Sequence, residues 1–599
     1  MIPKNALNRM GGKSWIELLE LMPILIAITI LPLIVYLKVN PAEVSNAWNS
    51  SWDYDFFSYY KSIVLIILSG PAVVILVLKS ILKRELMKKT KLYWPLLGFS
   101  ICVFLSAIFS DYPTIAWSGF YNRYEGALAI MAYAILFVYT VNCIHNKKQV
   151  KIILLAFLLS MILIMTIGIF QFFGLDLFRT EIGTRLILPK VYEDPGMQIT
   201  LQVEETQIFS TFKHPNYYGS YMAICLPFLG CLFILSKEKK YQIFFGILFA
   251  AGCFTLLGSR SRGGLLGISV AFLVFLIVFR KIVFRNWKRL LAICIIGLAG
   301  LFATDSLTGG VLIAKIRSIT SDPRIQINRY HLQDIILEDS SLKIISADAY
   351  LELQNIGNYG LAFKDKTGNY LFYSVDNKNK IHFEKDEYAR YDFQFGQHEE
   401  GPGLIFNYGS LTAHFLITKT SFRFIDPSNH IVDLEEIPSW GFEGKELWGS
   451  SRGYIWSRTL PMIKSNLLIG KGPDTFAIYF PQNDYIGKLI SYDTMKIIVD
   501  KPHNMYLQTA VNTGLISLLA LIIFLLMYIV SSIRWYWKHP PHDLLSNIGA
   551  AILFSVIGFM TTGIFNDSVV SVSTVFWILL GLGVSINLHL YHHTSEENG

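Results

Sequence analysis

The chain has 599 residues, of which 53% are hydrophobic and only 16% are charged, and its formal net charge is +8. A soluble domain usually carries about 25% charged residues, so this composition excludes an ordinary soluble protein and predicts a polytopic α-helical membrane protein. The basic residues fall mostly in short loops between apolar runs, and we therefore expect no nucleic-acid partner.

Apolar runs long enough to cross a membrane recur along most of the chain. A helix needs roughly 20 apolar residues to cross a hydrocarbon core of ~30 Å. We expect about twelve such helices, at residues 22–38, 62–82, 92–110, 126–144, 152–173, 217–236, 242–258, 264–280, 289–304, 505–533, 547–565 and 571–590. Residues 1–320 would then hold nine helices with a long outer loop at 174–216, and residues 505–599 would hold three helices and a short tail.

Lysine and arginine are distributed unevenly between alternate loops. They crowd the loops at 83–91, 147–151, 237–240 and 280–289, whereas the loop from Asn40 to Tyr60 contains neither a lysine nor an arginine. Because basic loops stay on the cytoplasmic side, both termini are expected to be cytoplasmic and the alternate loops to face the outside.

Residues 325–448 have a different pattern from the rest of the chain. Short runs such as NYLFYSV, ARYDFQF and LTAHFLITKTSFRFI alternate apolar and polar residues and are separated by DKTG, DNKNK and DPSN. This period of two, broken by turn residues, predicts strands. We expect an extracytoplasmic β-rich insert, built as a small sandwich or a jelly-roll-like domain.

Residues 449–504 return to a helical pattern. The stretch RGYIWSRTLPMIKSNLLIGKGPDTF predicts an amphipathic helix that ends near the turn at 470–473. Such a helix would lie on the membrane surface or against the helical bundle, and an ordinary packing helix is the alternative.

Polar side chains gather at the predicted outer ends of the helices. The candidates are Arg123, Glu125, Lys213, His214, Asn216, Arg260, Arg262, Arg452, Lys501, His503 and Asn504. Arginine binds phosphate oxygens through a planar fork of donors, so this arrangement suits a lipid pyrophosphate at the membrane surface. The alternative for any single arginine is an interfacial contact with membrane lipid phosphates.

His503 is the best candidate for a general base. Histidine commonly occurs as the neutral imidazole near physiological pH and can accept a proton from an attacking hydroxyl. The alternative is a polar cap at the start of the following helix. Asn504 would orient the ring or bind substrate, and His214 is a second candidate base, although Pro215 and Asn216 favour a turn there.

We expect neither a metal nor a cofactor. Asp474, Asp484, Asp493 and Asp500 lack a dense metal-ligand spacing and are predicted to be solvated, and the histidines form no HxxxH or HExxH motif.

Five motifs occur in a specific order along the chain. They are AWSGFYNRYEG, STFKHPNYYGSYM, GSRSRGGLLGI, RGYIWSRTLPMIKSNLLIGKGPDTF and HNMYLQTAVNTGLISLL. In this order and spacing the chain resembles the O-antigen ligase family, whose Wzy-C region also occurs in polysaccharide polymerases and protein O-oligosaccharyltransferases. The resemblance covers about residues 90–320 and 450–590, and the insert at 325–448 departs from the family's usual pattern.

The resemblance implies a metal-independent, inverting glycan transferase with a GT-C-like fold in a bacterial inner or cytoplasmic membrane. Its donor would be an undecaprenyl-pyrophosphate-linked glycan and its acceptor a glycan, a lipid or a protein outside the cytoplasm. The family's histidine corresponds to His503 and its arginines to Arg262 and Arg452, while Arg260 is a second arginine where the family pattern has one.

Three other functions remain as alternatives. A polysaccharide polymerase would use a lipid-linked glycan as its acceptor and share the same donor recognition. A transporter of lipid-linked glycans is disfavoured by the scarcity of charge in the middle of the predicted helices. A receptor that senses a ligand through the β-rich insert would need a cytoplasmic signalling domain, and the cytoplasmic loops are short.

Overall fold

The computed structural model describes residues 12–40, 54–82, 87–192, 206–310, 332–338, 340–346 and 349–597. The chain forms two compact units. Residues 1–313, 466–476 and 503–599 form the first, here called the helical unit, and residues 314–465 and 477–502 form the second, the β-rich unit. Most of the loop between Asn40 and Tyr60, the basic residues Lys83 and Arg84, and the start of the predicted insert lie outside the described residues.

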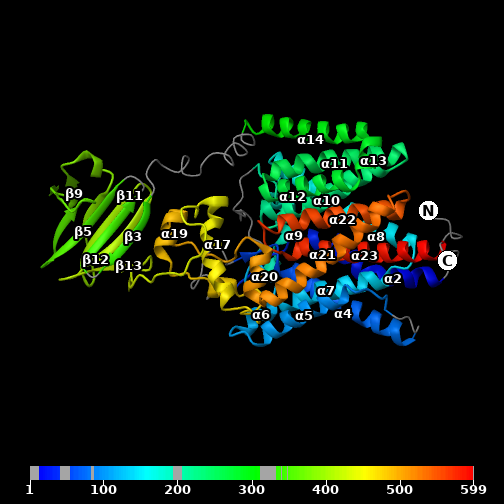
Figure 1. Ribbon diagram of the computed structural model, residues 1–599, viewed down its shortest axis with the longest axis horizontal. Helices are drawn as coiled ribbons and strands as arrows, with labels where there is room; N and C mark the ends of the chain where they lie inside the picture. The colour runs from blue at the N-terminus through cyan, green and yellow to red at the C-terminus, as the bar shows by residue number, and fades with distance from the viewer. Residues whose placement is uncertain are drawn as a thin grey trace. The chain divides into compact units, whose positions relative to one another are not determined.

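The helical unit is built from the apolar runs that the sequence contains (Figure 1). Its helices are α2 (Gly12–Thr29), α4 (Tyr59–Leu82), α5 (Tyr93–Ile108), α6 (Pro113–Ser118), α7 (Ala127–Cys143), α8 (Lys147–Phe172), α9 (Glu181–Ile187), α10 (Pro215–Leu235), α11 (Lys239–Ser259), α12 (Arg262–Val278), α13 (Arg280–Arg285), α14 (Trp287–Leu307), α20 (Met505–Thr513), α21 (Leu515–Lys538), α22 (Leu544–Thr562) and α23 (Val570–Glu597). A short pair of strands, β1 (Lys38–Val39) and β2 (Tyr54–Asp55), and the 3-10 turns η1 (Leu31–Leu33), η3 (Leu177–Arg179) and η4 (Lys190–Tyr192) complete it.

Nine helices in the described part of the chain are long and apolar enough to cross a membrane. They are α2 together with η1, α4, α8, α10, α11, α14, α21, α22 and α23. The helices α5, α7 and α12 are apolar but shorter, and they occupy the other three predicted positions. The polytopic helical class is therefore confirmed, whereas the count of twelve spanning helices and the GT-C-like architecture stay predictions.

The predicted helix at 505–533 is wrong as a single element. The chain forms α20 and then α21, with a break at Gly514, whose φ is +96°. A Cβ on Gly514 would lie 2.6 Å from the carbonyl oxygen of Leu468, and the Leu515 amide donates to the carbonyl of Leu467 at 3.1 Å. Only glycine accepts this backbone conformation without strain, and it lets the 466–476 segment pack against the break.

Buried apolar side chains hold α10, α12 and α22 together. α10 buries nearly all of its side chains, and α22 packs against both α10 and α12. The Ser555 hydroxyl on α22 donates to the Ile224 carbonyl on α10 at 2.8 Å. This close packing fixes the relative positions of the ends of these helices.

The β-rich unit contains two antiparallel sheets. The five-stranded sheet has the order β3-β4-β5-β6-β7 and the seven-stranded sheet the order β14-β13-β12-β11-β10-β9-β8. The strands are β3 (Leu332–Glu338), β4 (Ser341–Ser346), β5 (Tyr350–Gly357), β6 (Gly360–Lys364), β7 (Tyr370–Leu371), β8 (Tyr373–Val375), β9 (Lys380–Phe383), β10 (Asp392–His398), β11 (Gly401–Tyr408), β12 (Leu411–Ile417), β13 (Phe422–Ile425) and β14 (Ile431–Val432), with the 3-10 turn η5 at Asp386–Tyr388.

The two sheets share one hydrophobic core and form a sandwich. Phe363 of β6 lies 5.6 Å from Phe393 of β10, measured between ring centroids, and both side chains are fully buried. Each strand pairs with its neighbour in sequence, because short hairpin turns such as the one between β11 and β12 leave no room for a crossover. The sheets are therefore meanders, and the jelly-roll alternative is wrong.

The helices α17 (Trp448–Lys464) and α19 (Tyr485–Tyr492) also belong to the β-rich unit, together with all of α18 (Phe476–Tyr479) except its first residue. Leu489 of α19 is buried in the core of the sandwich, and α17 packs against α19. Within this unit α17 thus behaves as a packing helix, and it ends at Lys464, earlier than the predicted turn at 470–473.

Candidate functional site

The loop between α22 and α23, residues 563–569, connects elements that are distant in sequence. The Met505 amide at the start of α20 donates to the carbonyls of Gly563 at 2.8 Å and Asn566 at 3.0 Å. The Asn566 side-chain amide donates to the Ser220 hydroxyl at 2.8 Å and to the Asn216 carbonyl at 3.3 Å. The loop therefore holds the starts of α20 and α10 together.

The start of α12 lies at the same place. A Cβ on Gly263 would be 3.0 Å from the Asn566 side-chain nitrogen, and a Cβ on Gly219 of α10 would collide with the Ser261 hydroxyl. Three helices, α10, α12 and α20, consequently begin around one loop. We call this end of the helical unit the site end.

Each of the three helices carries a side-chain cap at its first turn. The His214 Nδ1 accepts from the Asn216 amide at 3.0 Å, and the Ser261 hydroxyl accepts from the Gly264 amide at 3.3 Å. The Asn504 Oδ1 accepts from the amides of Tyr506 at 2.9 Å and Leu507 at 3.0 Å. The Asn504 carbonyl group is thus engaged as a helix cap, and its predicted role in substrate binding stays a prediction.

His503 stands immediately before α20 and contacts a carboxylate. Its Nδ1 lies 3.2 Å from Oδ2 of Asp567; the His503 side chain is 35% exposed and the Asp567 side chain is fully buried. The φ of His503 is +50°, a left-handed conformation that residues other than glycine rarely adopt and that clusters at functional sites. A carboxylate beside Nδ1 suits the imidazole tautomer that carries its proton on Nδ1, and in that tautomer Nε2 is the acceptor.

Asp567 was missed at the sequence level. It is the only ionisable residue between the two last predicted helices, in the stretch FNDSVV, and the predicted topology puts it on the same side as the cationic candidates. Its position in this loop could have identified Asp567 as a candidate site residue, although nothing in the neighbouring sequence indicates that His503 is its partner.

Arg123 is held in a buried ion pair. Its Nε donates to Oδ1 of Asp474 at 2.6 Å, and its Nη2 lies 3.8 Å from Oε2 of Glu125. Asp474 Oδ2 also accepts from the amides of Phe120 at 2.7 Å and Glu125 at 3.2 Å. The prediction that Asp474 is solvated is wrong, because this carboxylate is only 4% exposed and anchors the loop before α7.

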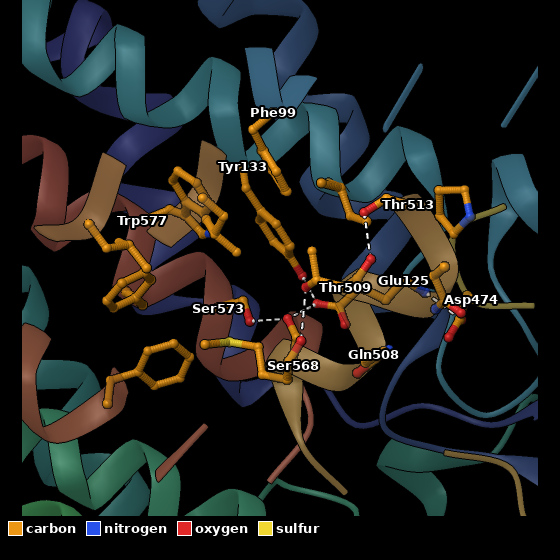
Figure 2. Close-up of a pocket in the computed structure, with 18 residues that line it drawn as sticks. Phe99, Glu125, Tyr133, Asp474, Gln508, Thr509, Thr513, Ser568, Ser573 and Trp577 are labelled. Carbon is orange, nitrogen blue, oxygen red and sulfur yellow. Dashed lines mark hydrogen bonds between the residues drawn. The ribbon is translucent and has the colours of Figure 1, made fainter. Parts of the chain in front are cut away.

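Glu125 joins this ion pair to the loop that carries Asp567. Its Oε1 accepts from the hydroxyls of Tyr133 and Ser568, each at 2.7 Å, and Ser568 also contacts the Ser573 hydroxyl at 2.8 Å. Figure 2 shows these groups turned toward one another. Burial raises the pKa of Glu125 to about 7, against the lowering effect of the Arg123 charge.

A cavity of about 70 Å³ lies beside Glu125 and is lined by side chains of α5, α7, α20, α21, α22 and α23 (Figure 2). Gln508 Oε1 and Asn512 Oδ1 are buried there, and neither atom has a hydrogen-bond partner within the described part of the chain. The cavity is lined mostly by apolar side chains, and it has room for water molecules that would satisfy these two acceptors.

The other predicted residues of the helical unit surround the site end. Arg262 is exposed at the first position of α12, and His214 is exposed where α10 begins. Lys213 lines a small cavity with Arg123 and Asn122, and its Nζ lies 3.5 Å from the Asn122 carbonyl. Arg260 ends α11 with a φ of +58° and donates to the Thr206 hydroxyl at 3.1 Å.

Arg452 belongs to the β-rich unit, and the structure defines its surroundings there. Its Nη1 donates to the Gly449 carbonyl at 2.6 Å, where Gly449, Ser450 and Ser451 all have positive φ. Its charge acts on the partly buried Tyr492 hydroxyl of α19. The predicted role of Arg452 in catalysis stays a prediction from its motif.

Among the residues that the structure describes, no group of three or more His, Cys, Asp or Glu side chains is arranged to hold a metal ion.

Comparison with known proteins gives one family match. The family model described as O-antigen ligase matches residues 404–522, which run from β11 of the sandwich through α17 and α19 to α21 and include Arg452 and His503. No curated protein matches the chain. The resemblance at residues 90–320 lies outside this match and stays a prediction. Residues 404–522 of this chain are thus similar to the O-antigen ligase family.

Proposed function

We propose that this protein is a membrane glycan ligase that transfers a glycan from an undecaprenyl-pyrophosphate donor to an acceptor by metal-independent, inverting displacement. The family match indicates an O-antigen ligase-like or polymerase-like membrane glycan enzyme. The observation that carries the finer proposal is the meeting of three helix starts, Arg262 and the His503–Asp567 pair around the loop at 563–569.

Helix starts are favourable places for the donor pyrophosphate. The dipole of each helix puts partial positive charge at its first turn, although side-chain caps already accept from some of the amides there. α10, α12 and α20 contribute this charge together, and Arg262 adds a guanidinium that can bind two phosphate oxygens at once. Lys213 adds a second positive charge close to Arg123. This arrangement supports a site for a dianionic leaving group.

Arg123 plays a different part in this proposal from the one its sequence suggests. Its guanidinium is 95% buried and already contacts Asp474, so it holds the loop before α7 in place. Removing Arg123 would leave the Asp474 carboxylate buried without its cation, which is costly. We therefore assign Arg123 a positioning role and leave donor binding to Arg262 and Lys213.

The transfer step needs a base for the acceptor hydroxyl. The acceptor oxygen attacks the anomeric carbon from the face opposite the phosphate, the bond from that carbon to the phosphate oxygen breaks, and the electron pair leaves with undecaprenyl pyrophosphate. His503 Nε2 takes the hydroxyl proton, and the buried Asp567 carboxylate stabilises the imidazolium that forms. The helix starts and Arg262 stabilise the charge on the leaving pyrophosphate.

The site end lies far from the basic loops. α10 starts at the site end and has 21 residues, which gives a length of about 30 Å. At its other end, Arg289 donates to the carbonyls of Ile234 at 2.6 Å and Ser236 at 2.9 Å. A separation close to the thickness of a hydrocarbon core supports a site on the face opposite the cytoplasmic loops.

A polysaccharide polymerase is the second candidate function, because the family match includes both kinds of enzyme. The same donor site would serve either reaction. The two functions differ only in the acceptor, which would be a second lipid-linked glycan for a polymerase.

Reconstitution tests the proposal. The purified protein in vesicles, supplied with an undecaprenyl-pyrophosphate oligosaccharide and separate glycan, lipid and peptide acceptors, is expected to release undecaprenyl pyrophosphate and to form an inverted glycosidic bond, with or without EDTA. Lengthening of the lipid-linked glycan alone would identify a polymerase. Movement of intact donor across the bilayer without release of pyrophosphate would contradict transfer and identify a transporter.

A further inference from the structure

The β-rich unit contains a large open cleft that the proposed transfer step does not use. Its volume is about 860 Å³, and it lies between β3, the segment 434–448, α17 and α19. Ligand pockets in proteins usually measure about 300–1,000 Å³ and enclose most of a drug-sized ligand. All of the lining residues belong to one compact unit.

The cleft carries an excess of negative charge. Its lining includes five carboxylates, on Asp334, Glu435, Glu436, Glu446 and Asp484, and two cationic side chains, on Lys445 and Arg458. Burial raises the pKa of Asp334, and the nearby Asp484 charge adds to this effect. An anionic ligand would be repelled by this lining, whereas a neutral or a cationic one would not.

Polar groups in the cleft are placed to bind hydroxyls. Arg458 Nε donates to Asp484 Oδ2 at 2.9 Å, and its guanidinium lies 4.7 Å from the centre of the Tyr454 ring. The Ser491 hydroxyl is buried and has no hydrogen-bond partner in the described residues. A buried hydroxyl of this kind has a favourable partner in a ligand hydroxyl, which can both donate and accept.

An aromatic surface lies at the same cleft. Trp448 is 43% exposed, and its ring stacks on Phe442 with centroids 6.1 Å apart and contacts Trp456 at 5.6 Å. These contacts fix the indole while leaving part of it open to a ligand. A rigid aromatic ring beside carboxylates and an arginine fork is the usual combination for packing the C–H face of a sugar and binding its hydroxyls.

We propose that this cleft binds the acceptor, and that the acceptor is a saccharide chain without phosphate or carboxylate groups. The acceptor role of this saccharide rests on the proposed transfer function, whereas the inference that the cleft binds a saccharide does not depend on that function. The charge of the lining excludes teichoic-acid-like and uronic-acid-rich chains as preferred ligands and favours neutral or amino sugars.

Binding to the purified full-length protein tests this inference. The probes are tetramers of N-acetylglucosamine, glucosamine and galacturonic acid, with tetralysine as a peptide of positive charge. The two glucosamine-based tetramers are expected to bind and the galacturonate tetramer is not. Failure of both to bind, preference for tetragalacturonate, or tighter binding of tetralysine would each overturn the inference.

Matched variants locate the binding. Trp448→Ala is expected to weaken binding of the N-acetylglucosamine tetramer about fivefold or more, whereas Trp440→Ala, which removes an exposed tryptophan outside the cleft, is not. Glu436→Lys is expected to raise the affinity for tetragalacturonate about threefold, while Glu443→Lys, on the same segment outside the cleft, leaves it unchanged. Equal effects within either pair would place the ligand elsewhere.

Transfer assays separate this inference from the proposed function. His503→Ala is expected to keep saccharide binding and to lose transfer. Full transfer by His503→Ala with binding unchanged would contradict the proposed chemistry and leave the cleft as a saccharide site, whereas normal transfer by Trp448→Ala at low acceptor concentration would contradict the acceptor role of the cleft alone.

Discussion

The two units each contain a histidine beside an aspartate at nearly the same distance. In the helical unit, His503 Nδ1 lies 3.2 Å from Asp567 Oδ2; in the β-rich unit, His382 Nε2 lies 3.0 Å from Asp376 Oδ2. The Asp567 side chain is fully buried, whereas the Asp376 side chain is 38% exposed and also accepts from the amides of Lys378 and Lys380 in a hairpin turn. The distance between the imidazole nitrogen and the carboxylate oxygen therefore does not by itself distinguish a candidate functional site from a structural turn.

Burial and surroundings make the difference between the two pairs. An interaction between a carboxylate and an imidazole is weak where water screens it and strong where water is excluded. Asp567 also lies on the loop where three helices begin, whereas Asp376 stabilises the connection between β8 and β9. Under the proposed function, the His503–Asp567 pair is therefore the one of the two that is expected to take part in the chemistry.

The largest expected effect distinguishes the two histidines. His503→Ala is expected to lower the transfer rate about 10²–10⁴-fold, the usual contribution of general acid–base catalysis, with little change in donor binding. His382→Ala is the matched control and is expected to leave the rate unchanged. Initial rates of undecaprenyl pyrophosphate release measure both, and a His503→Ala rate above about a tenth of normal would reduce His503 to a polar cap.

A smaller effect is expected from the arginines at the start of α12. Arg262→Lys keeps the charge but loses the planar fork, so transfer is expected to fall about tenfold or more at normal membrane levels. Arg260→Lys is the control, because the Arg260 side chain donates to Thr206 away from the first turn of α12. Donor titrations compare the two variants. An equal loss of transfer in both variants would indicate that the two arginines act as general interfacial charges and that Arg262 does not form a phosphate site.

The third effect is on stability and not on the transfer rate, and it concerns the network beside the site. Burial raises the pKa of Glu125 from an ordinary value of 4.5 to about 7. Between pH 4.5 and about 7 the unfolded chain has lost this proton, whereas the folded protein has kept it. The free energy of unfolding therefore falls as pH rises through this interval, by an amount on the order of 3 kcal/mol. Glu125→Gln cannot ionise, and its melting temperature relative to wild type should rise by a few degrees from pH 5 to pH 8. A difference that does not change with pH would contradict the buried, protonated carboxyl.

The local elements were largely predictable because their signals are local. The residues of β5, Tyr350–Gly357, alternate between buried and partly exposed positions, as the period of two in the sequence predicts. The apolar runs likewise gave helices close to their predicted positions. The break at Gly514 was not predictable, since the apolar run continues through it and the cause is a contact with Leu468.

The site was predictable only in part, for the same reason. Arg262 and His503 are polar residues at the edges of apolar runs, so each stands out in its own stretch of sequence. Asp474 does not, because its ion pair with Arg123 joins residues 351 positions apart. Asp567 pairs with His503 only after α22 has packed against α10 and α12 and brought the loop at 563–569 to the start of α20. Partners of this kind follow from the tertiary fold and leave no local pattern.

A double-variant cycle on His503 and Asp567 tests the central claim most directly. If Asp567 acts only by orienting the imidazole, then Asp567→Asn lowers transfer in the wild-type background but has no further effect once His503 is alanine. The transfer rates of the two single variants and the double variant are measured in reconstituted vesicles, with melting curves to confirm folding. We predict that the double variant matches His503→Ala. A double variant whose loss is the product of the two single losses would show that Asp567 acts independently and would contradict the proposed catalytic pair.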